Sequence, residues 1–463
     1  MSRLVVISNR VQQLNQGAGG NQGGLAVALL AALRERGGVW FGWSGGTTET
    51  FDGAITYERE GPTTTAVIDL EDQDIDEYYN GFANRTLWPL FHYRVDLTEF
   101  ERDFNSGYAR VNRRFADTVR PLIEDEDVVW VHDYHLVPLG EELRTRGVTN
   151  RIGFFLHIPW PPTDLLVSLP SHRRLVEALF AYDVVGFQTA DWLENFRHYV
   201  VTQLGGTIGS DGHVTVGDRT IRAIPAPIGI ETAEFEAAAA TQGAIFARDR
   251  MYMSATGRSL IVGVDRLDYS KGLPERFAGY ERFLASHPDR RGLVYMLQIA
   301  PPSREKVDTY QEIRATLDGL SGRINGEYAD IDWTPLRYVN KGFPRAELAG
   351  VYRAARIALV TPLRDGMNLV AKEFVAAQDP RDPGVLILSR FAGAAAQLTG
   401  AVLVNPHSAE EMSDALATAL EMPREERIRR WEVLIDNVRR EDVHWWCDLF
   451  LNALEDVHVG EPA

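Results

Sequence analysis

The chain has 463 residues, enough for two or three domains, and its 45% hydrophobic and 24% charged residues are typical of a globular protein. Its formal net charge of -17 argues against nucleic acid or an anionic membrane surface as a partner, because both would be repelled. A phosphate ligand would therefore need a local cluster of basic side chains. The single cysteine, Cys447, excludes an intramolecular disulfide and fits a reducing compartment.

The N-terminus begins with an apolar strand pattern and lacks the charged-then-apolar order of a signal peptide. No apolar run approaches the length of a membrane span. We therefore expect a soluble cytoplasmic protein that acts on small molecules, without a nucleic-acid or membrane partner.

Short apolar strands alternate with helical patterns along the whole chain, which predicts an α/β fold with doubly wound parallel sheets. A first series of strands is expected at Arg3–Ile7, Val128–Val131, Ile152–Leu156, Asp183–Phe187 and Ile221–Ile224. A second series is expected at Ser259–Val264, Leu293–Ile299, Ile357–Val360 and Val385–Leu388. Between the two series, residues 208–220 form a polar pattern around Asp211-Gly212 that predicts a small hairpin.

Pro225-Ala226-Pro227-Ile228-Gly229 is the best candidate for a linker, because proline and glycine interrupt the chain between the two strand series. We place the domain boundary shortly after it, which gives an N-terminal domain at 1–235 and a second domain at 236–440. Residues 441–456 form a heavily apolar C-terminal helix that is expected to pack on a domain.

Polar and charged residues recur where the predicted strands end. The ends in the first half are Ser8-Asn9-Arg10, His132-Asp133-Tyr134-His135 and His157-Ile158-Pro159-Trp160. The ends in the second half are the runs 265–272, 301–304 and 364–366. In open parallel sheets, ligands bind outside the carboxyl ends of the strands, so these residues predict the binding edge of each sheet.

The segment Val360–Glu373 places a strand, a loop and a helix start in immediate succession. Asn368 is a favourable N-cap for an apolar helix that runs through Ala377. The start of that helix suits a phosphate or diphosphate, because its backbone N–H groups lie at the positive end of the helix dipole. Asp365 is placed to hold sugar hydroxyls and Glu373 to accept hydrogen bonds from a ribose. An ordinary αβ unit with solvated acids is the alternative interpretation.

Arg266 and Lys271 are the clearest pair of cations. Arginine can bind a diphosphate with two parallel hydrogen bonds, while lysine adds a compact charge. The alternative is a pair of surface residues in solvent-exposed ion pairs. Arg10 and Arg304 carry the same two interpretations.

Asp133 and His157 each follow an apolar strand, so they are either functional or satisfied structural groups. His132 and His135 lack a nearby cysteine or helical glutamate, which makes the spacing weak for zinc, and no metal site is expected. The absence of a GxSxG motif also argues against a serine hydrolase.

The glycine-rich loop Gly17–Gly24 follows the first strand and precedes a helix. It has neither dinucleotide nor Walker spacing, but its backbone can approach phosphates closely. Tyr79 and Trp88 stand in an aromatic segment and would either contact a sugar phosphate or belong to the core.

Together these segments closely resemble the trehalose-6-phosphate synthase family, retaining glycosyltransferases of the family 20 type. The resemblance covers nearly the whole chain in the family's order. The matching runs are Val5-Val6-Ile7-Ser8-Asn9-Arg10, Trp40-Phe41-Gly42-Trp43-Ser44-Gly45, Leu87-Trp88-Pro89, Val131-His132-Asp133-Tyr134-His135, Phe154-Phe155-Leu156-His157-Ile158-Pro159, Arg266-Leu267-Asp268-Tyr269-Ser270-Lys271-Gly272, Gln298-Ile299-Ala300-Pro301, Gly322-Arg323-Ile324-Asn325-Gly326 and Asp365 to Glu373.

The resemblance implies a GT-B architecture, in which two Rossmann-like domains face each other across a cleft and the C-terminal helix crosses back to the N-terminal domain. It implies a UDP-forming α,α-trehalose-phosphate synthase, a hexosyltransferase that moves glucose from UDP-glucose to glucose 6-phosphate. The products are α,α-trehalose 6-phosphate and UDP. Neither a cofactor nor a metal is implied, and a homo-oligomer is left open.

The family's functional residues map onto matching positions of this chain. The implied catalytic residues are Asp133, His157, Arg266, Lys271 and Asp365. The implied donor site adds Gly23, Gly24, Phe343, Leu369, Val370, Ala371, Lys372 and Glu373 to Arg266, Lys271 and Asp365. The implied acceptor site consists of Arg10, Tyr79, Trp88, Asp133, Ile158 and Arg304.

Four alternatives remain at this stage. The donor could be ADP- or GDP-glucose, because no side chain is diagnostic of the base. The acceptor could be another phosphosugar or a pseudo-sugar. A non-catalytic sensor of trehalose precursors would be expected to have lost some of Arg266, Lys271, Asp365 and Glu373, yet all four are present. Asp133 as a covalent nucleophile ranks below attack without an enzyme intermediate.

Overall fold

The computed structural model describes residues 2–11, 24–303 and 307–456, and it divides into two compact units. Unit 1 contains the described residues up to Ile228 together with those from His444 onward, and unit 2 is Gly229–Val443. Both units are α/β, and each is built on its own sheet, as the sequence predicts. None of the helices within these ranges is long and apolar enough to cross a membrane.

The sheet of unit 1 has ten strands in the order β3-β4-β2-β1-β5-β6-β7-β10-β9-β8. The seven strands from β4 to β10 in that order pair in parallel, and β1 lies in the interior, between β2 and β5. The strands are β1 Leu4–Arg10, β2 Gly38–Thr47, β3 Thr56–Glu60, β4 Thr63–Leu70, β5 Val128–His132, β6 Ile152–Phe155, β7 Val184–Phe187, β8 Thr207–Ile208, β9 His213–Val216 and β10 Arg219–Pro225.

The polar segment between the two strand series forms the hairpin that the sequence predicts. β9 pairs antiparallel with both β8 and β10, and β10 pairs in parallel with β7. The turn at Gly212 has a φ of 85°, a conformation that glycine adopts without strain. The hairpin therefore extends one edge of the sheet.

Helices cover both faces of this sheet. The longer helices of unit 1 are α1 Gly24–Arg36, the π-helix η1 Ile75–Leu87, α4 Arg102–Val119, α8 Ala190–Leu204 and α17 Val443–Glu455. The shorter ones are α2 Asp72–Asp74, α3 Trp88–Phe91, η2 Val95–Leu97, η3 Arg120–Leu122, η4 Tyr134–Leu136, α5 Leu139–Thr145, α6 Thr163–Leu166, α7 His172–Ala178 and η5 Leu179–Ala181.

The C-terminal helix α17 packs on the central strands of unit 1. The rings of Trp446 and Phe450 lie 4.9 and 4.8 Å from the ring of Trp130 on β5. Gly153 and Gly186 make room for Phe450, because a Cβ at either position would lie 2.6 or 2.8 Å from an atom of that ring. The last helix is thus part of the core of unit 1.

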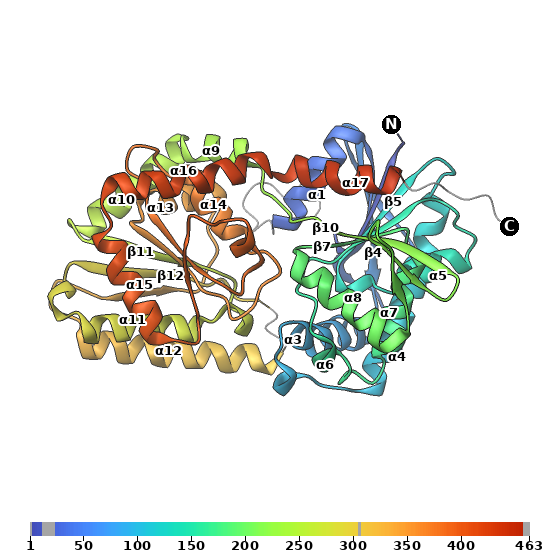
Figure 1. Cartoon of the computed structure of the whole chain (residues 1–463), viewed down its shortest axis with the longest axis horizontal. Coiled ribbons are helices and arrows are strands. Elements are labelled where there is room, and N and C mark those ends of the chain that lie inside the picture. The colour runs from blue at the N-terminus through green and yellow to red at the C-terminus, as the bar shows by residue number, and fades with distance from the viewer. Residues whose placement is uncertain (1, 12–23, 304–306, 457–463) are drawn as a thin grey trace. The chain divides into compact units, whose positions relative to one another are not determined.

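Unit 2 contains a six-stranded, fully parallel sheet in the order β13-β12-β11-β14-β15-β16, which is the strand order of a doubly wound dinucleotide-binding fold. Helices α11, α12 and α15 cover one face, and α9, α10, α13, α14 and α16 cover the other (Figure 1). The strands are β11 Ser259–Val264, β12 Val294–Ile299, β13 Leu336–Val339, β14 Ile357–Val360, β15 Val385–Ser389 and β16 Val402–Val404.

The longer helices of unit 2 are α9 Thr232–Ala239, α10 Gln242–Ala255, α11 Leu273–Ser286, α12 Asp308–Tyr328, α13 Arg345–Ala354, α14 Leu369–Ala377, α15 Ala409–Glu421 and α16 Arg424–Arg440. The short 3-10 turns are η6 Tyr269–Lys271, η7 Pro288–Arg290 and η8 Gly393–Ala396.

All the predicted strands are present, and each begins and ends close to the predicted residues. The largest difference is at β1, which continues past Ile7 to Arg10. Several further strands were not predicted. The apolar run of β2 is interrupted by Gly42 and is followed by Gly45 and Gly46. Glycine weakens a strand pattern, so the sequence did not predict this strand. β13 and β16 are short edge strands with few buried side chains.

Gly186→Ala should destabilise the protein by about 1–3 kcal/mol, because the added methyl group must displace the rings of Phe155 and Phe450. Denaturant unfolding followed by tryptophan fluorescence measures the change. Gly319→Ala is the control: in α12, no atom lies within 4 Å of the position that its Cβ would take, so this variant should be neutral or up to about 1 kcal/mol more stable. Equal effects of the two substitutions would contradict the packing argument.

Candidate functional site

The polar strand ends lie at the carboxyl edge of each sheet, as the sequence predicts. In unit 1 the chain proceeds from β1 to one side through β2 and to the other side through β5, so the strand order reverses between β1 and β5. In unit 2 the same reversal lies between β11 and β14. Such switch points are where doubly wound sheets bind ligands.

Asp133 directly follows β5 in a strained conformation. Its φ of 74° and ψ of 167° fall in a region that is nearly reserved for glycine. Its Oδ1 accepts a hydrogen bond of 3.1 Å from the backbone N–H of His157, at the end of the neighbouring strand β6. The structure therefore brings together two of the predicted catalytic residues and orients the Asp133 carboxylate across the strand ends.

His157 is held as an uncharged imidazole. Burial lowers its pKa to about 3, and burial also lowers the pKa of His132 well below its usual range. The Nε2 of His157 lies 3.1 Å from Nδ1 of His132. The Nδ1 of His157 lies 3.4 Å from the amide Nε2 of Gln188. His157 therefore supplies no positive charge at neutral pH, and both ring nitrogens already face protein partners.

Arg10 and Tyr79, both predicted for an acceptor phosphate, each pack against Trp43. The guanidinium of Arg10 is 5.1 Å from the Trp43 ring centre, and the Tyr79 ring is 5.5 Å from it. The Tyr79 ring also stacks on that of His135, with the ring centres 5.9 Å apart. Gly45, at φ 91°, is needed here because a Cβ would lie 2.0 Å from the Arg10 guanidinium.

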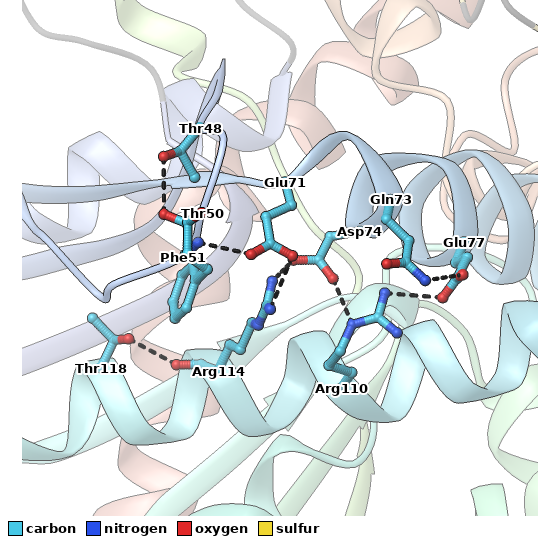
Figure 2. A network of polar contacts seen from close by, with 10 residues as sticks. All are labelled: Thr48, Thr50, Phe51, Glu71, Gln73, Asp74, Glu77, Arg110, Arg114 and Thr118. Atoms are coloured by element: carbon cyan, nitrogen blue, oxygen red, sulfur yellow. Dashed lines mark hydrogen bonds and ion pairs between the residues drawn. The ribbon is translucent and has the colours of Figure 1, made fainter.

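Tyr79 is carried by the π-helix η1, whose start is anchored to α4 by a charge network (Figure 2). The Asp74 side chain is fully buried and accepts bonds from Arg110, at 2.8 Å, and from Arg114. Glu77 accepts from Arg110 at 2.9 Å, and Glu71 from Arg114 at 3.0 Å. π-helical turns are rare and often stand at functional sites, and here the network holds such a helix in place.

Trp88 and Ile158, predicted to shape the acceptor pocket, are both buried at 5% exposure. The Trp88 ring lies 5.7 Å from that of Tyr134, the residue after Asp133. Ile158 directly follows His157. Their role at a sugar remains a prediction.

In unit 2, Lys271 and Asp365 form an ion pair. The Nζ of Lys271 lies 2.5 Å from Oδ2 of Asp365, although the two residues follow different strands, β11 and β14. Asn368 also donates to Asp365 Oδ2, at 3.1 Å, and its Oδ1 caps α14 by accepting from Ala371 N–H at 3.3 Å. One side chain thus joins the ion pair to the start of the helix, and the predicted cap at Asn368 is confirmed.

Two neighbouring groups of α14, the buried Lys372 and the partly buried Glu373, titrate near neutrality. Burial raises the pKa of Glu373 to about 7, partly opposed by the positive charge of Arg345. Burial lowers the pKa of Lys372 to about 7. Charge in the first turns of this helix therefore responds to pH in the range where the protein would work.

The remaining donor residues are placed as follows. Arg266 is exposed after β11, Phe343 follows β13 with Lys341 Nζ 5.1 Å from its ring centre, and Leu369, Val370 and Ala371 form the first turn of α14. Gly24 begins α1, while Gly23 and Arg304 lie outside the described residues. Among the residues that the structure describes, no group of three or more His, Cys, Asp or Glu side chains is placed to hold a metal ion.

Sequence reasoning missed Trp43, Gln188 and Arg276 as residues around the site. Trp43 belongs to the matching run Trp40–Gly45, but its contacts with Arg10 and Tyr79 depend on the register of β1 and β2. Gln188 is one of many polar residues after a strand. In the sequence Arg276 resembles a surface charge of a helix, whereas its side chain is 0% exposed.

Asp133→Gly should be more stable than Asp133→Ala by about 1 kcal/mol, the reverse of the usual order for these residues. Both variants lose the carboxylate, but only alanine retains a Cβ in a conformation that costs about 1–3 kcal/mol, against roughly 1 kcal/mol for the extra chain freedom of glycine. Chemical denaturation of the two variants gives the difference. A more stable alanine variant would contradict strain at Asp133.

Comparison with known proteins agrees over the full chain. The model of glycosyltransferase family 20 matches residues 3–456. A trehalose-6-phosphate synthase of Sinorhizobium fredii is 50% identical over 460 residues, which cover 98% of this chain and 98% of that protein. The crystal structure of a UDP-forming α,α-trehalose-phosphate synthase from Burkholderia xenovorans in complex with glucose 6-phosphate has a TM-score of 0.95 at 48% identity, covering 98% of this chain and all of that one. An Escherichia coli structure bound with UDP-2-fluoro glucose has a TM-score of 0.94 at 46% identity, covering 99% of this chain and all of that one.

Proposed function

The chain belongs to glycosyltransferase family 20, and we propose that it transfers glucose from UDP-glucose to glucose 6-phosphate with retention of configuration, giving α,α-trehalose 6-phosphate and UDP. The observation that carries this proposal is the 50% identity to a trehalose-6-phosphate synthase over 98% of both chains. It is supported by the pairing of Lys271 with Asp365 at the switch point of unit 2.

Most of the proposed donor residues lie on unit 2, while Gly24 belongs to unit 1 and Gly23 precedes it in the chain. Lys271 and Arg266 supply positive charge to the diphosphate, and the N–H groups of Leu369 and Val370 donate to it, because they have no acceptor within the helix and Asn368 caps only Ala371. Asp365 keeps Lys271 extended towards the strand ends and accepts hydroxyls of the transferred glucose. Glu373 accepts hydrogen bonds from the ribose.

The acceptor residues lie on unit 1. Arg10 and Tyr79 bind the acceptor phosphate, and Arg304 of unit 2 adds a further cation by its match to the family. The Asp133 carboxylate orients an acceptor hydroxyl, while Trp88 and Ile158 shape the pocket. His157 contacts the donor glucose as a neutral group, because burial keeps its pKa near 3.

The reaction needs no protein nucleophile. The acceptor hydroxyl oxygen attacks the anomeric carbon from the face that the diphosphate leaves, and a diphosphate oxygen takes the acceptor proton. One C–O bond breaks as another forms on the same face of the sugar, so the configuration is retained. Negative charge on the departing UDP grows in the transition state, where preorganised cations stabilise it most. Arg266 and Lys271 supply the positive charge that stabilises the departing UDP, and we propose that no metal is required.

The test is incubation with glucose 6-phosphate and each of UDP-, ADP- and GDP-glucose, followed by identification of the nucleotide and the sugar by NMR. We expect UDP and an α,α-linked disaccharide phosphate, with the rate unchanged in EDTA. Lys271→Ala should lower kcat by about 10²–10³, since a charge on the leaving group is lost. If the wild type bound both substrates without turnover, the result would favour the sensor hypothesis. A different disaccharide as product would overturn the acceptor assignment.

Relative to Glu373→Gln, the wild type should lose about tenfold in affinity for UDP-glucose between pH 8 and pH 6, as the ionised fraction of Glu373 falls through its pKa near 7. The carboxylate accepts ribose hydrogen bonds above that pH, and its protonated form accepts them less well below it. UDP-glucose is the appropriate probe for calorimetry, because its diphosphate does not titrate in this range.

Glu373→Gln is the matched variant for this pH series. Lys372 gains a positive charge as the pH falls, which would strengthen diphosphate binding, so the variant should show a flat or rising affinity towards pH 6. A loss of affinity in the variant equal to that of the wild type would contradict the role of Glu373.

We also propose a cytoplasmic location. The sequence has a single cysteine, Cys447, so no intramolecular disulfide can form, which fits a reducing compartment, and the proposed substrates are a nucleotide sugar and a phosphosugar.

A further inference from the structure

Arg276 is a buried cation of unit 2 that the proposed chemistry does not use. It stands in the first half of α11, and its side chain is 0% exposed. Nη1 donates to Asp265 Oδ2 at 2.6 Å and to Gln298 Oε1 at 2.9 Å, and Nε donates to Thr361 Oγ1 at 3.0 Å. These three partners stand at the carboxyl ends of β11, β12 and β14, so one guanidinium joins three adjacent strands at the switch point.

The fourth contact of Arg276 leads to the loop that is proposed to bind the diphosphate. Its Nη2 donates to the backbone carbonyl of Lys271 at 3.3 Å. The next residue, Gly272, has a φ of 62°, and a Cβ there would lie 2.5 Å from the carbonyl oxygen of Thr361. The turn that carries Lys271 therefore packs directly on the end of β14, with Arg276 beneath it.

The rest of this turn is also held by hydrogen bonds. Asp268 Oδ1 accepts from Ser270 N–H at 2.9 Å, and its Oδ2 accepts from the Tyr310 hydroxyl at 2.9 Å. Ser270 in turn accepts, through its carbonyl, from Leu363 N–H at 2.8 Å. These bonds fix the start of the turn, whereas Arg276 is the side chain that holds the carbonyl of Lys271 itself.

We propose that Arg276 is a positioning residue: its guanidinium sets the location of Lys271 and thereby the fit of the loop to a nucleoside diphosphate. Burying an ion pair seldom stabilises a fold more than an apolar replacement would, so directional bonding is the better reason for an arginine here. A planar guanidinium group can donate to three strand ends and a carbonyl at once, whereas the single ammonium group of a lysine cannot. The inference rests on the proposed function in one respect, that Lys271 binds the diphosphate.

The test is a double-mutant cycle in binding. The wild type, Arg276→Lys, Lys271→Ala and the double variant are titrated calorimetrically with UDP and with uridine, which has the same base and ribose but no phosphate. Arg276→Lys keeps a positive charge beside Asp265. It should weaken UDP binding by about tenfold and uridine binding by less than about twofold, and its effect on UDP should fall below about twofold when Lys271 is already alanine.

Arg427→Lys is the matched control. Arg427 is a buried arginine of the same unit, 5% exposed, and its Nη2 donates to Asp382 Oδ1 at 2.6 Å. Asp382 precedes β15, so this pair lies at the amino edge of the sheet, opposite the binding edge. Its substitution should leave UDP binding unchanged, even if the melting temperature falls.

The outcomes separate the two hypotheses. A wild type that fails to bind UDP would contradict the proposed function and this role with it. Suppose instead that the wild type binds UDP. The positioning role alone would then be contradicted if Arg276→Lys had no effect on UDP binding, or if its effect were the same with and without the Lys271 side chain. Should Arg276→Lys not fold, Thr361→Val removes the acceptor of Arg276 Nε, and it should weaken UDP binding by about threefold with the same dependence on Lys271.

Discussion

Parallel strand pairing is the constraint on which the site depends. Strands that all run in one direction end at one edge, so residues far apart in sequence meet there without any long loop. In unit 1 this brings Asp133 to the backbone of His157, and in unit 2 it brings Lys271 to Asp365. The helices on either face keep the strands fixed and leave this edge to the polar side chains.

The distribution of charge follows from the same arrangement. The chain carries a net charge of -17, yet the switch point of unit 2 gathers Lys271 and Arg276. Each is matched by one carboxylate, Asp365 and Asp265 respectively, so neither cation is left uncompensated. Under the proposed function a phosphate ligand would compete with Asp365 for Lys271, whereas the pair of Arg276 and Asp265 is buried. One pair is thus exchangeable and the other is permanent.

Much of this fold could be predicted from the sequence, because fully buried parallel strands appear as unbroken apolar runs and Asn368 is a recognisable helix cap. The mixed Trp and Gly pattern of β2 and the short edge strand β16 lack such a run, so local sequence does not reveal them. The π-helix η1 was missed for a different reason: its start is held by Arg110 and Arg114 from another helix. Candidate residues at strand ends were found by residue type, but Arg276 was not, since only tertiary packing shows that a helical arginine is buried.

The packing of α17 has a consequence for biosynthesis. The face of the first sheet around Trp130, Gly153 and Gly186 is covered by Trp446 and Phe450, which are synthesised only after unit 2. While the nascent chain is still on the ribosome, this apolar surface has no cover, although the second unit is already complete apart from its end. Unit 1 is therefore begun before unit 2 but completed after it, and a chain released before α17 is made would expose that surface to aggregation or to chaperones.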